Sequence, residues 1–242
     1  MRKKKLKLKE WQKTTLLVFA MAIWVFCSVV ASQFLVGMLL VLLVGGERLV
    51  QPVYAGIYSV LSYGLAILLT FVILPKIIRQ KNPSREELGL MGMPTWTDIG
   101  LSPIAFVMST VLAAALVTLF SLFPWFNADE VQQTGFTVMM NGGEKVIGFM
   151  VLVILAPIAE ELIFRGWLYG KLRARVNMPL AILVTSVLFG LMHFQWNVAV
   201  NVFALSVVLC GLREITGTIY AGILTHMIKN GVAFYLLYVL GM

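Results

Sequence analysis

The sequence is divided into long apolar segments joined by short polar connections, and this pattern limits the folds that the chain can adopt. An α-helix rises 1.5 Å per residue, so about 20 apolar residues cross the hydrocarbon core of a bilayer. Two of the predicted segments, the fifth and the sixth, are shorter, so between six and eight spans are expected. The seven predicted segments cover residues 14–44, 53–78, 99–123, 146–172, 179–194, 198–212 and 218–240.

The composition supports the same interpretation. Of the 242 residues, 60% are hydrophobic and 12% are charged, and the mean hydropathy is +0.92. A soluble domain cannot bury so much apolar surface, whereas a lipid bilayer can surround it. We therefore predict an all-α fold, a polytopic transmembrane bundle of about seven helices with no large soluble domain.

The net charge of +8 is concentrated at the ends of the predicted helices. Positively charged loops stay on the cytoplasmic side of a membrane, so this distribution predicts an orientation. It favours a cytoplasmic amino terminus in a multi-pass protein of the cell membrane, and no nucleic-acid partner is expected. The predicted inner ends carry the basic residues of 2–13, 76–85 and 171–175 and Arg213, whereas the outer connections hold only Arg48 and Lys145.

Two adjacent carboxylates and an arginine interrupt the fourth apolar segment. Ionisable groups at membrane depth cost roughly 2.5–3.5 kcal/mol each on insertion scales, so they mark candidate functional positions. Glu161 and Arg165 are four residues apart, and this spacing predicts an ion pair on one helical face. Glu160 lies about 100° around the helix from Glu161, without that partner, and is the candidate for chemistry.

The only two histidines of the chain also fall in predicted spans. His193 closes the fifth segment, and His226 lies one turn before Asn230 in the seventh. Counted from the helix ends, Glu160, His193 and Asn230 lie roughly 20 Å from the inner side, with His226 one turn lower. Side chains at a similar depth on neighbouring helices are expected to converge in one cavity.

Two kinds of hydrolytic site fit these four residues. In the first, Glu160 and His193 hold a water and remove its proton, while His226 and Asn230 stabilise the oxyanion. In the second, Glu160, His193 and His226 ligate zinc and leave a fourth position open for water. The residues alone do not choose between no cofactor and zinc.

More ordinary roles are also open to several of these residues. A buried histidine is usually a satisfied polar group of the core, and Asn230 could form a hydrogen bond between helices. Lys229 is expected to extend its ammonium group toward the inner interface. Glu161 and Arg165 are expected to support the site rather than react.

Three motifs in order resemble one known family. They are Glu160-Glu161-x-x-x-Arg165, Phe189-x-x-x-His193 and His226-x-x-x-Asn230. They are similar to the motifs of the CPBP intramembrane proteases, also called the ABI family, which includes type II CAAX prenyl endopeptidases and bacteriocin-immunity proteins. The resemblance covers about residues 143–242. It implies a catalytic helix core (143–242) preceded by accessory transmembrane helices (14–142), and the charge pattern predicts a basic cytoplasmic tail (1–13).

The resemblance implies an intramembrane endopeptidase whose partners are the lipid bilayer and a peptide or membrane-protein substrate. It assigns water activation to Glu160 and His193, and oxyanion stabilisation to His226 and Asn230. Family members have been described as metal-dependent and as metal-free, so the cofactor stays open. The alternatives are a non-catalytic membrane-binding, immunity or scaffold protein of the same fold, and a small transporter. No oligomeric state is predicted.

Overall fold

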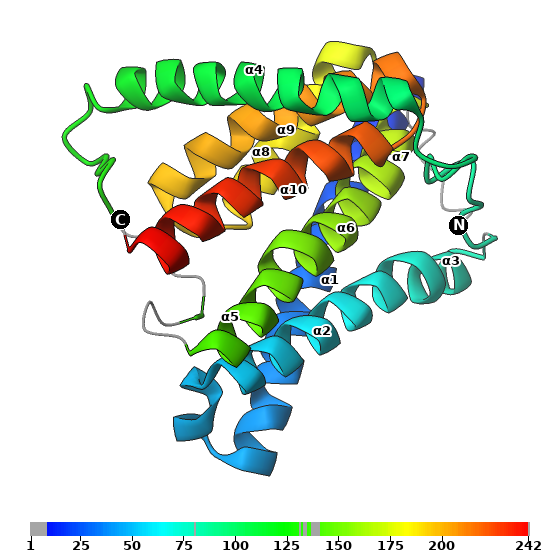
Figure 1. The fold of residues 1–242 in the computed structure, drawn as a ribbon. Helices are drawn as coiled ribbons and strands as arrows, with labels where there is room; N and C mark the ends of the chain where they lie inside the picture. Colours follow the sequence, from blue (N-terminus) through cyan, green and yellow to red (C-terminus); the bar gives the residue numbers. More distant parts are fainter. Residues whose placement is uncertain (1–8, 80, 131, 133–134, 137–140, 242) are drawn as a thin grey trace.

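The chain folds into a bundle of helical rods that correspond to the predicted apolar segments (Figure 1). The computed structural model describes residues 9–79, 81–130, 132, 135–136 and 141–241. Within these ranges all regular structure is helical, so the predicted all-α fold is confirmed. Residues 1–8, which form most of the predicted basic tail, lie outside the described residues.

The first half of the chain contributes three rods. The first is α1, the second combines α2, a π-helical segment and α3, and the third is α4. A short 3₁₀ helix joins the first two rods. The bounds are α1 Glu10–Val44, the 3₁₀ helix Gly46–Val50, α2 Pro52–Leu68, the π segment Leu69–Ile73, α3 Leu74–Ile77 and α4 Trp96–Phe120.

The second half contributes four rods. The fourth rod of the chain is interrupted twice by π-helical turns, and the last rod ends in one. The bounds are α5 Gly142–Phe149, the π segment Met150–Leu155, α6 Ala156–Glu161, the π segment Leu162–Tyr169, α7 Gly170–Arg173, α8 Met178–Leu191, α9 Trp196–Thr216, α10 Tyr220–Phe234 and the terminal π segment Tyr235–Leu240.

Among the described residues, six rods are long and apolar enough to cross a membrane. The remaining rod, α8, which is the fifth along the chain, is apolar but has only 14 residues, which corresponds to about 21 Å. All seven predicted segments are therefore helical, and the six spans identify a multi-pass membrane protein. The shortness expected of the fifth segment is confirmed, whereas that expected of the sixth is wrong, because α9 has 21 residues and is long enough to span.

Local sequence signals set where several rods begin and end. Thr95 accepts a hydrogen bond from the Asp98 backbone N–H, and Asp98 accepts one in return from the Thr95 backbone, which forms a capping box at the start of α4. Asn141 and Glu144 make the same reciprocal contacts at the start of α5. Gly217 ends α9 with a φ of 70°, a conformation that glycine adopts without strain.

Packing of the rods places the fourth one between the α1–α2 hairpin and the group formed by α4, α9 and α10 (Figure 1). Figure 1 shows α4 lying along α9 and α10, and α1 and α2 forming a hairpin on the other side of the α5–α7 rod. Between α8 and α9 the backbones approach closely, since a Cβ added to Gly190 would lie 2.9 Å from the Ala199 carbonyl oxygen. This close approach fixes the end of α8, where His193 follows.

Candidate active site

Glu160 and Glu161 close α6, the short α-helical stretch between two π-helical segments of the fourth rod. Such wide turns are often found at functional sites because they rotate the following side chains. The two carboxylates face different surroundings. Glu161 is completely buried, whereas 16% of the Glu160 side chain is exposed, and it lines a cavity.

Glu161 is held by a cation and by a histidine from another rod. Arg165 donates a hydrogen bond from Nη1 to Oε1 of Glu161 at 2.9 Å, so the predicted ion pair is confirmed. The Nδ1 atom of His226 lies 3.1 Å from the same oxygen. The guanidinium of Arg165 also stacks over the Phe189 ring at 4.4 Å. Helix α10 approaches Glu161 closely at Gly222, where an added Cβ would lie 3.1 Å from Oε2 of Glu161.

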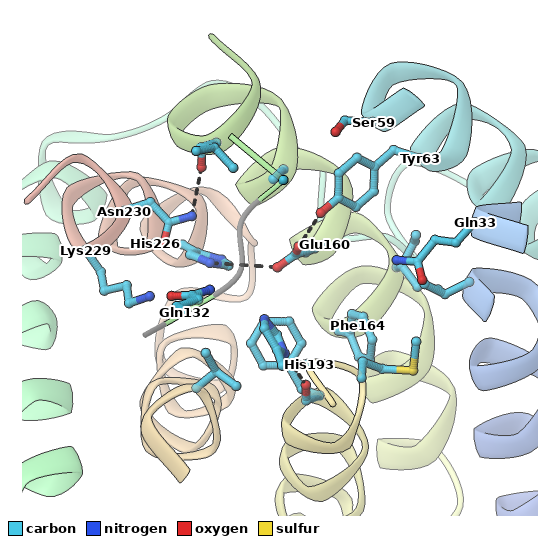
Figure 2. Close-up of a pocket in the computed structure, with 18 of the residues that line it drawn as sticks. Gln33, Ser59, Tyr63, Gln132, Glu160, Phe164, His193, His226, Lys229 and Asn230 are labelled. Atoms are coloured by element: carbon cyan, nitrogen blue, oxygen red, sulfur yellow. Dashed lines mark hydrogen bonds and ion pairs between the residues drawn. The ribbon is translucent and has the colours of Figure 1, made fainter. Parts of the chain in front are cut away.

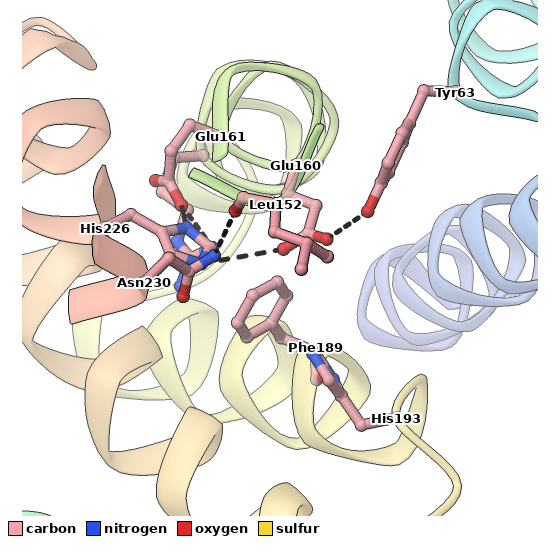
Figure 3. A network of polar contacts seen from close by, with 9 residues as sticks. Tyr63, Leu152, Glu160, Glu161, Phe189, His193, His226 and Asn230 are labelled. Carbon is pink, nitrogen blue, oxygen red and sulfur yellow. Dashed lines mark hydrogen bonds and ion pairs between the residues drawn. The ribbon is translucent and has the colours of Figure 1, made fainter. Parts of the chain in front are cut away.

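Glu160 has a partner that the sequence analysis missed. The hydroxyl of Tyr63, on α2, donates a hydrogen bond to Oε1 of Glu160 at 2.5 Å (Figure 3). The other carboxylate oxygen, Oε2, lies 3.8 Å from Nε2 of His226. Glu160 is thus held from one side by α2 and faces α10 on the other.

His193 lies just beyond the end of α8, which stops at Leu191 rather than at the predicted residue 194. Its Nδ1 atom is 2.9 Å from the Phe189 carbonyl oxygen. The backbone then turns sharply, because Phe194 has a φ of 53°. The Phe189 ring lies between the two imidazoles, with centroids 5.2 Å from His193 and 6.0 Å from His226, both edge to face.

Asn230 lies one turn beyond His226 on α10. Its Nδ2 atom donates a hydrogen bond to the Leu152 carbonyl oxygen at 2.8 Å, in the first π segment of the fourth rod. That carbonyl is open to a side chain because a π turn disturbs the regular helical hydrogen bonding. Asn230 therefore bridges two rods, as a buried amide can, and it also lines the cavity.

One cavity of about 390 Å³ is lined by all four predicted catalytic residues, Glu160, His193, His226 and Asn230 (Figure 2). They come from α6, the turn after α8, and α10. Lys229 lines the same cavity, so the prediction that it extends toward the inner interface is wrong. Other polar groups reach the cavity from α1, α2 and the connection before α5, and they include Gln33, Tyr58, Ser59, Tyr63 and Gln132.

The same part of the chain matches a known family. Residues 142–232 match the family described as "Type II CAAX prenyl endopeptidase Rce1-like". This part of the chain is similar to the CAAX prenyl endopeptidases. The matched stretch contains all six residues predicted to form or support the site. It begins within one residue of the boundary expected from the motifs, and it leaves the first three rods unmatched.

Two curated proteins are similar to the chain. "Putative membrane peptidase YdiL" of Bacillus subtilis (strain 168) is 25% identical over 179 residues, which cover 72% of this chain and 69% of the relative. "UPF0177 protein YxdF" of Lactococcus lactis subsp. lactis (strain IL1403) is 30% identical over 92 residues, which cover 37% of this chain and 50% of the relative. No solved structure matches. Together the comparisons support a membrane endopeptidase in general.

The predicted zinc ligands do not form a ready metal site in the described part of the chain. In the part of the chain that the structure describes, no group of three or more His, Cys, Asp or Glu side chains is placed to hold a metal ion. The Nδ1 contacts of His226 with Glu161 and of His193 with a backbone carbonyl leave Nε2 of each imidazole as the nitrogen that could bind a metal.

The missed contact of Tyr63 had a sequence signal of its own. Ala55, Ser59 and Tyr63 are spaced by four residues, which puts them on one face of α2. This stripe of a small residue, a hydroxyl and a phenol lies beside Tyr58 and Ser62, and it indicates a face of α2 turned toward a polar cavity. The contact between His226 and Glu161 had no comparable signal, because no local pattern relates two helices 65 residues apart.

Proposed function

We propose that the chain is an intramembrane endopeptidase that hydrolyses a peptide bond with water activated by Glu160 and His193. His226 and Asn230 stabilise the oxyanion of the tetrahedral intermediate. The observation that carries this proposal is the convergence of these four side chains on one cavity inside a transmembrane bundle. The matched family and the membrane-peptidase relative support the same reaction class.

The contact of His193 favours a role as proton acceptor. A carbonyl oxygen can only accept a hydrogen bond, so Nδ1, 2.9 Å from the Phe189 carbonyl, carries the proton in this contact. In the neutral imidazole the lone pair is then on Nε2. A nitrogen of this kind can take a proton from a water held beside Glu160.

The contact of His226 favours the opposite role. Glu161 is paired with Arg165 and is therefore an acceptor, so Nδ1 of His226 donates to it. Nε2 of His226 lies 3.8 Å from Oε2 of Glu160, and an N–H at this position can donate to an oxyanion. Asn230 uses one N–H of its amide on the Leu152 carbonyl, and the second N–H remains for the same oxyanion.

The proposed reaction has two steps. Water attacks the substrate carbonyl carbon while its proton passes to Glu160 or His193, and the carbonyl electron pair becomes the oxyanion beside His226 and Asn230. The oxyanion then re-forms the carbonyl, the C–N bond breaks, and the stored proton passes to the leaving nitrogen. The products are a carboxylic acid and an amine, and no covalent enzyme intermediate is needed.

Replacement of Glu160 by glutamine tests this proposal. Glutamine keeps the size of the side chain but cannot take the proton, so Glu160→Gln is expected to lower cleavage by roughly 10²–10⁴-fold. The measurement is cleavage of a randomised library of unstructured peptides by the purified protein in detergent. Glu47→Gln, which changes an exposed acid outside the cavity, is the control and is expected to keep full activity.

The result also separates the competing functions. Cleavage that persists in Glu160→Gln would rule out Glu160 as the water activator. A wild type that binds peptides but cuts none would favour the non-catalytic binding or scaffold function. Treatment of the wild type with a chelator tests zinc separately, since a zinc-dependent enzyme loses activity and regains it when zinc is restored.

The remaining parts of the proposal concern the setting of the reaction. We place the catalytic core at residues 143–242 and the accessory helices at 14–142, in a cell membrane with the amino terminus in the cytoplasm. The accessory helices contribute to the site, because Tyr63 on α2 donates a hydrogen bond to Glu160. The substrate is a peptide or a membrane-associated protein that reaches the cavity within the bilayer.

A further inference from the structure

The wall of the cavity opposite α10 is built by α1 and α2, which lie outside the matched family segment. Val29 and Gln33 line it from α1, one helical turn apart. Ser59 and Tyr63 line it from α2 at the same spacing. Figure 2 shows Gln33 on the far side of Glu160 from His226 and Asn230. A substrate segment beside Glu160 would therefore lie against this wall.

Gln33 places a polar carboxamide in the middle of the apolar transmembrane helix α1. After Gln12, in the first turn, it is the only carboxamide in α1. No described residue forms a hydrogen bond with its side chain. The Gln33 side chain is half-buried and lines the cavity, so its amide is available to a molecule bound there. The neighbouring Ser32, by contrast, donates to the Ser28 carbonyl oxygen.

An extended peptide has the groups that this amide lacks. A peptide bond must leave its helix to be attacked, and its backbone N–H and C=O groups then lose their partners where no bulk water replaces them. A carboxamide presents one acceptor and two donors, which match the C=O and N–H of a main chain. Ser59 donates its proton to the Ala55 carbonyl oxygen, and its oxygen is left as a further acceptor.

We propose that Gln33, assisted by Ser59, binds the main chain of an extended substrate segment and holds it between the α1–α2 hairpin and Glu160. This inference rests on the proposed peptidase function and gives it a binding subsite. Because the contacts are made to backbone groups, the subsite accepts many sequences and selects for segments that are not helical. Gln33 is thus a residue that binds substrate, and it takes no part in the proton transfers.

The test replaces Gln33 with methionine, which has similar length and no hydrogen-bonding amide. Gln33→Met is expected to raise KM for an unstructured peptide substrate about tenfold, because the substrate main chain loses its partner, while kcat changes less than about threefold. The matched control is Phe34→Met, at the next position of α1. Phe34 is 68% exposed and faces away from the cavity, so its replacement is expected to leave KM unchanged.

A binding measurement in the Glu160→Gln background separates this inference from the proposed function. The probe is a dye-labelled decapeptide library of randomised sequence, followed by fluorescence polarisation. Addition of Gln33→Met is expected to weaken binding about tenfold. Equal binding with and without the Gln33 amide would overturn the subsite even if Glu160 proves essential. Weaker binding with cleavage retained in Glu160→Gln would support the subsite and overturn the mechanism.

Discussion

Glu160 and Glu161 have the same side chain and adjacent positions, but their contacts differ completely. Glu161 is buried between Arg165 and His226, whereas Glu160 lines the cavity and is held by Tyr63. The environment of each carboxylate, and not its residue type, therefore decides its expected role. Single substitutions can therefore test these roles one at a time.

Loss of the Tyr63 hydroxyl is expected to slow the reaction without weakening substrate binding. Tyr63→Phe removes the 2.5 Å hydrogen bond that orients Glu160, and hydrogen bonds to charged groups contribute about 1.5–3 kcal/mol. We expect kcat to fall about 10–100-fold with KM within about twofold, measured on peptide cleavage. Tyr58→Phe is the control, since Tyr58 lines the same cavity on the same helix. A KM effect without a kcat effect would contradict an orienting role.

The buried arginine is expected to matter more for stability than an arginine at the surface. Arg165→Met leaves the buried Glu161 without its guanidinium partner, which costs about 3–5 kcal/mol of unfolding free energy. Arg173→Met removes a pair with Glu214 in which the arginine side chain is 42% exposed, so its expected cost is at most about 1 kcal/mol. Reversible unfolding in mixed micelles measures both. Equal costs would show that burial of the pair is unimportant.

At the scale of whole helices, glycines decide how closely the rods approach. Gly222 lets α10 come near Glu161, and Gly190 lets α8 come near α9. Small residues at such crossings are the usual means of close packing in membrane proteins, because lipid supplies no hydrophobic force to drive helices together. The site depends on both crossings, since His226 follows Gly222 by one turn and His193 follows Gly190 by three residues.

Replacement of Gly190 by alanine is expected to disturb both packing and activity. The new Cβ would lie 2.9 Å from the Ala199 carbonyl oxygen, so α8 must move, at a cost of about 1–3 kcal/mol. Gly211→Ala on α9 meets no neighbouring atom within 4 Å and is expected to be neutral or to stabilise by up to about 1 kcal/mol. Thermal unfolding in detergent and peptide cleavage measure the difference. Two variants of equal stability would contradict the close approach.

At the scale of the whole molecule, the positions of charged and aromatic residues indicate the same orientation in the membrane. The basic ends of α3 and α7 and the start of α1 gather on one side of the bundle (Figure 1). The rings of Trp125, in the connection after α4, and Trp196, at the start of α9, lie 5.6 Å apart. This arrangement fits the proposed orientation with the amino terminus inside.

Labelling of single cysteines tests that orientation. With Cys27 and Cys210 replaced by alanine, Asp129→Cys in intact cells is expected to react with a membrane-impermeant maleimide. Arg175→Cys is expected to react only after the cells are permeabilised, because its basic loop stays on the cytoplasmic side. Both positions are exposed in the structure, so access is set by the membrane. Labelling in the reverse order would overturn the orientation.

Much of this protein follows from the order of its residues. Runs of apolar residues determined the helices, because a bilayer requires every backbone group in a span to be bonded within it. Four-residue spacing determined the Glu161–Arg165 pair, and distance from the helix ends placed the other polar groups at one depth. These are local properties of single helices, so a linear pattern is sufficient to predict them.

The tertiary structure alone decided how the helices are rotated and which side chains meet. It brought Tyr63 to Glu160 and His226 to Glu161, and it turned Lys229 into the cavity. The physical reason is that rotation about a helix axis depends on the packing of neighbouring rods. Close contacts at glycines and wide π-helical turns set that rotation, and neither leaves a periodic signal in the sequence.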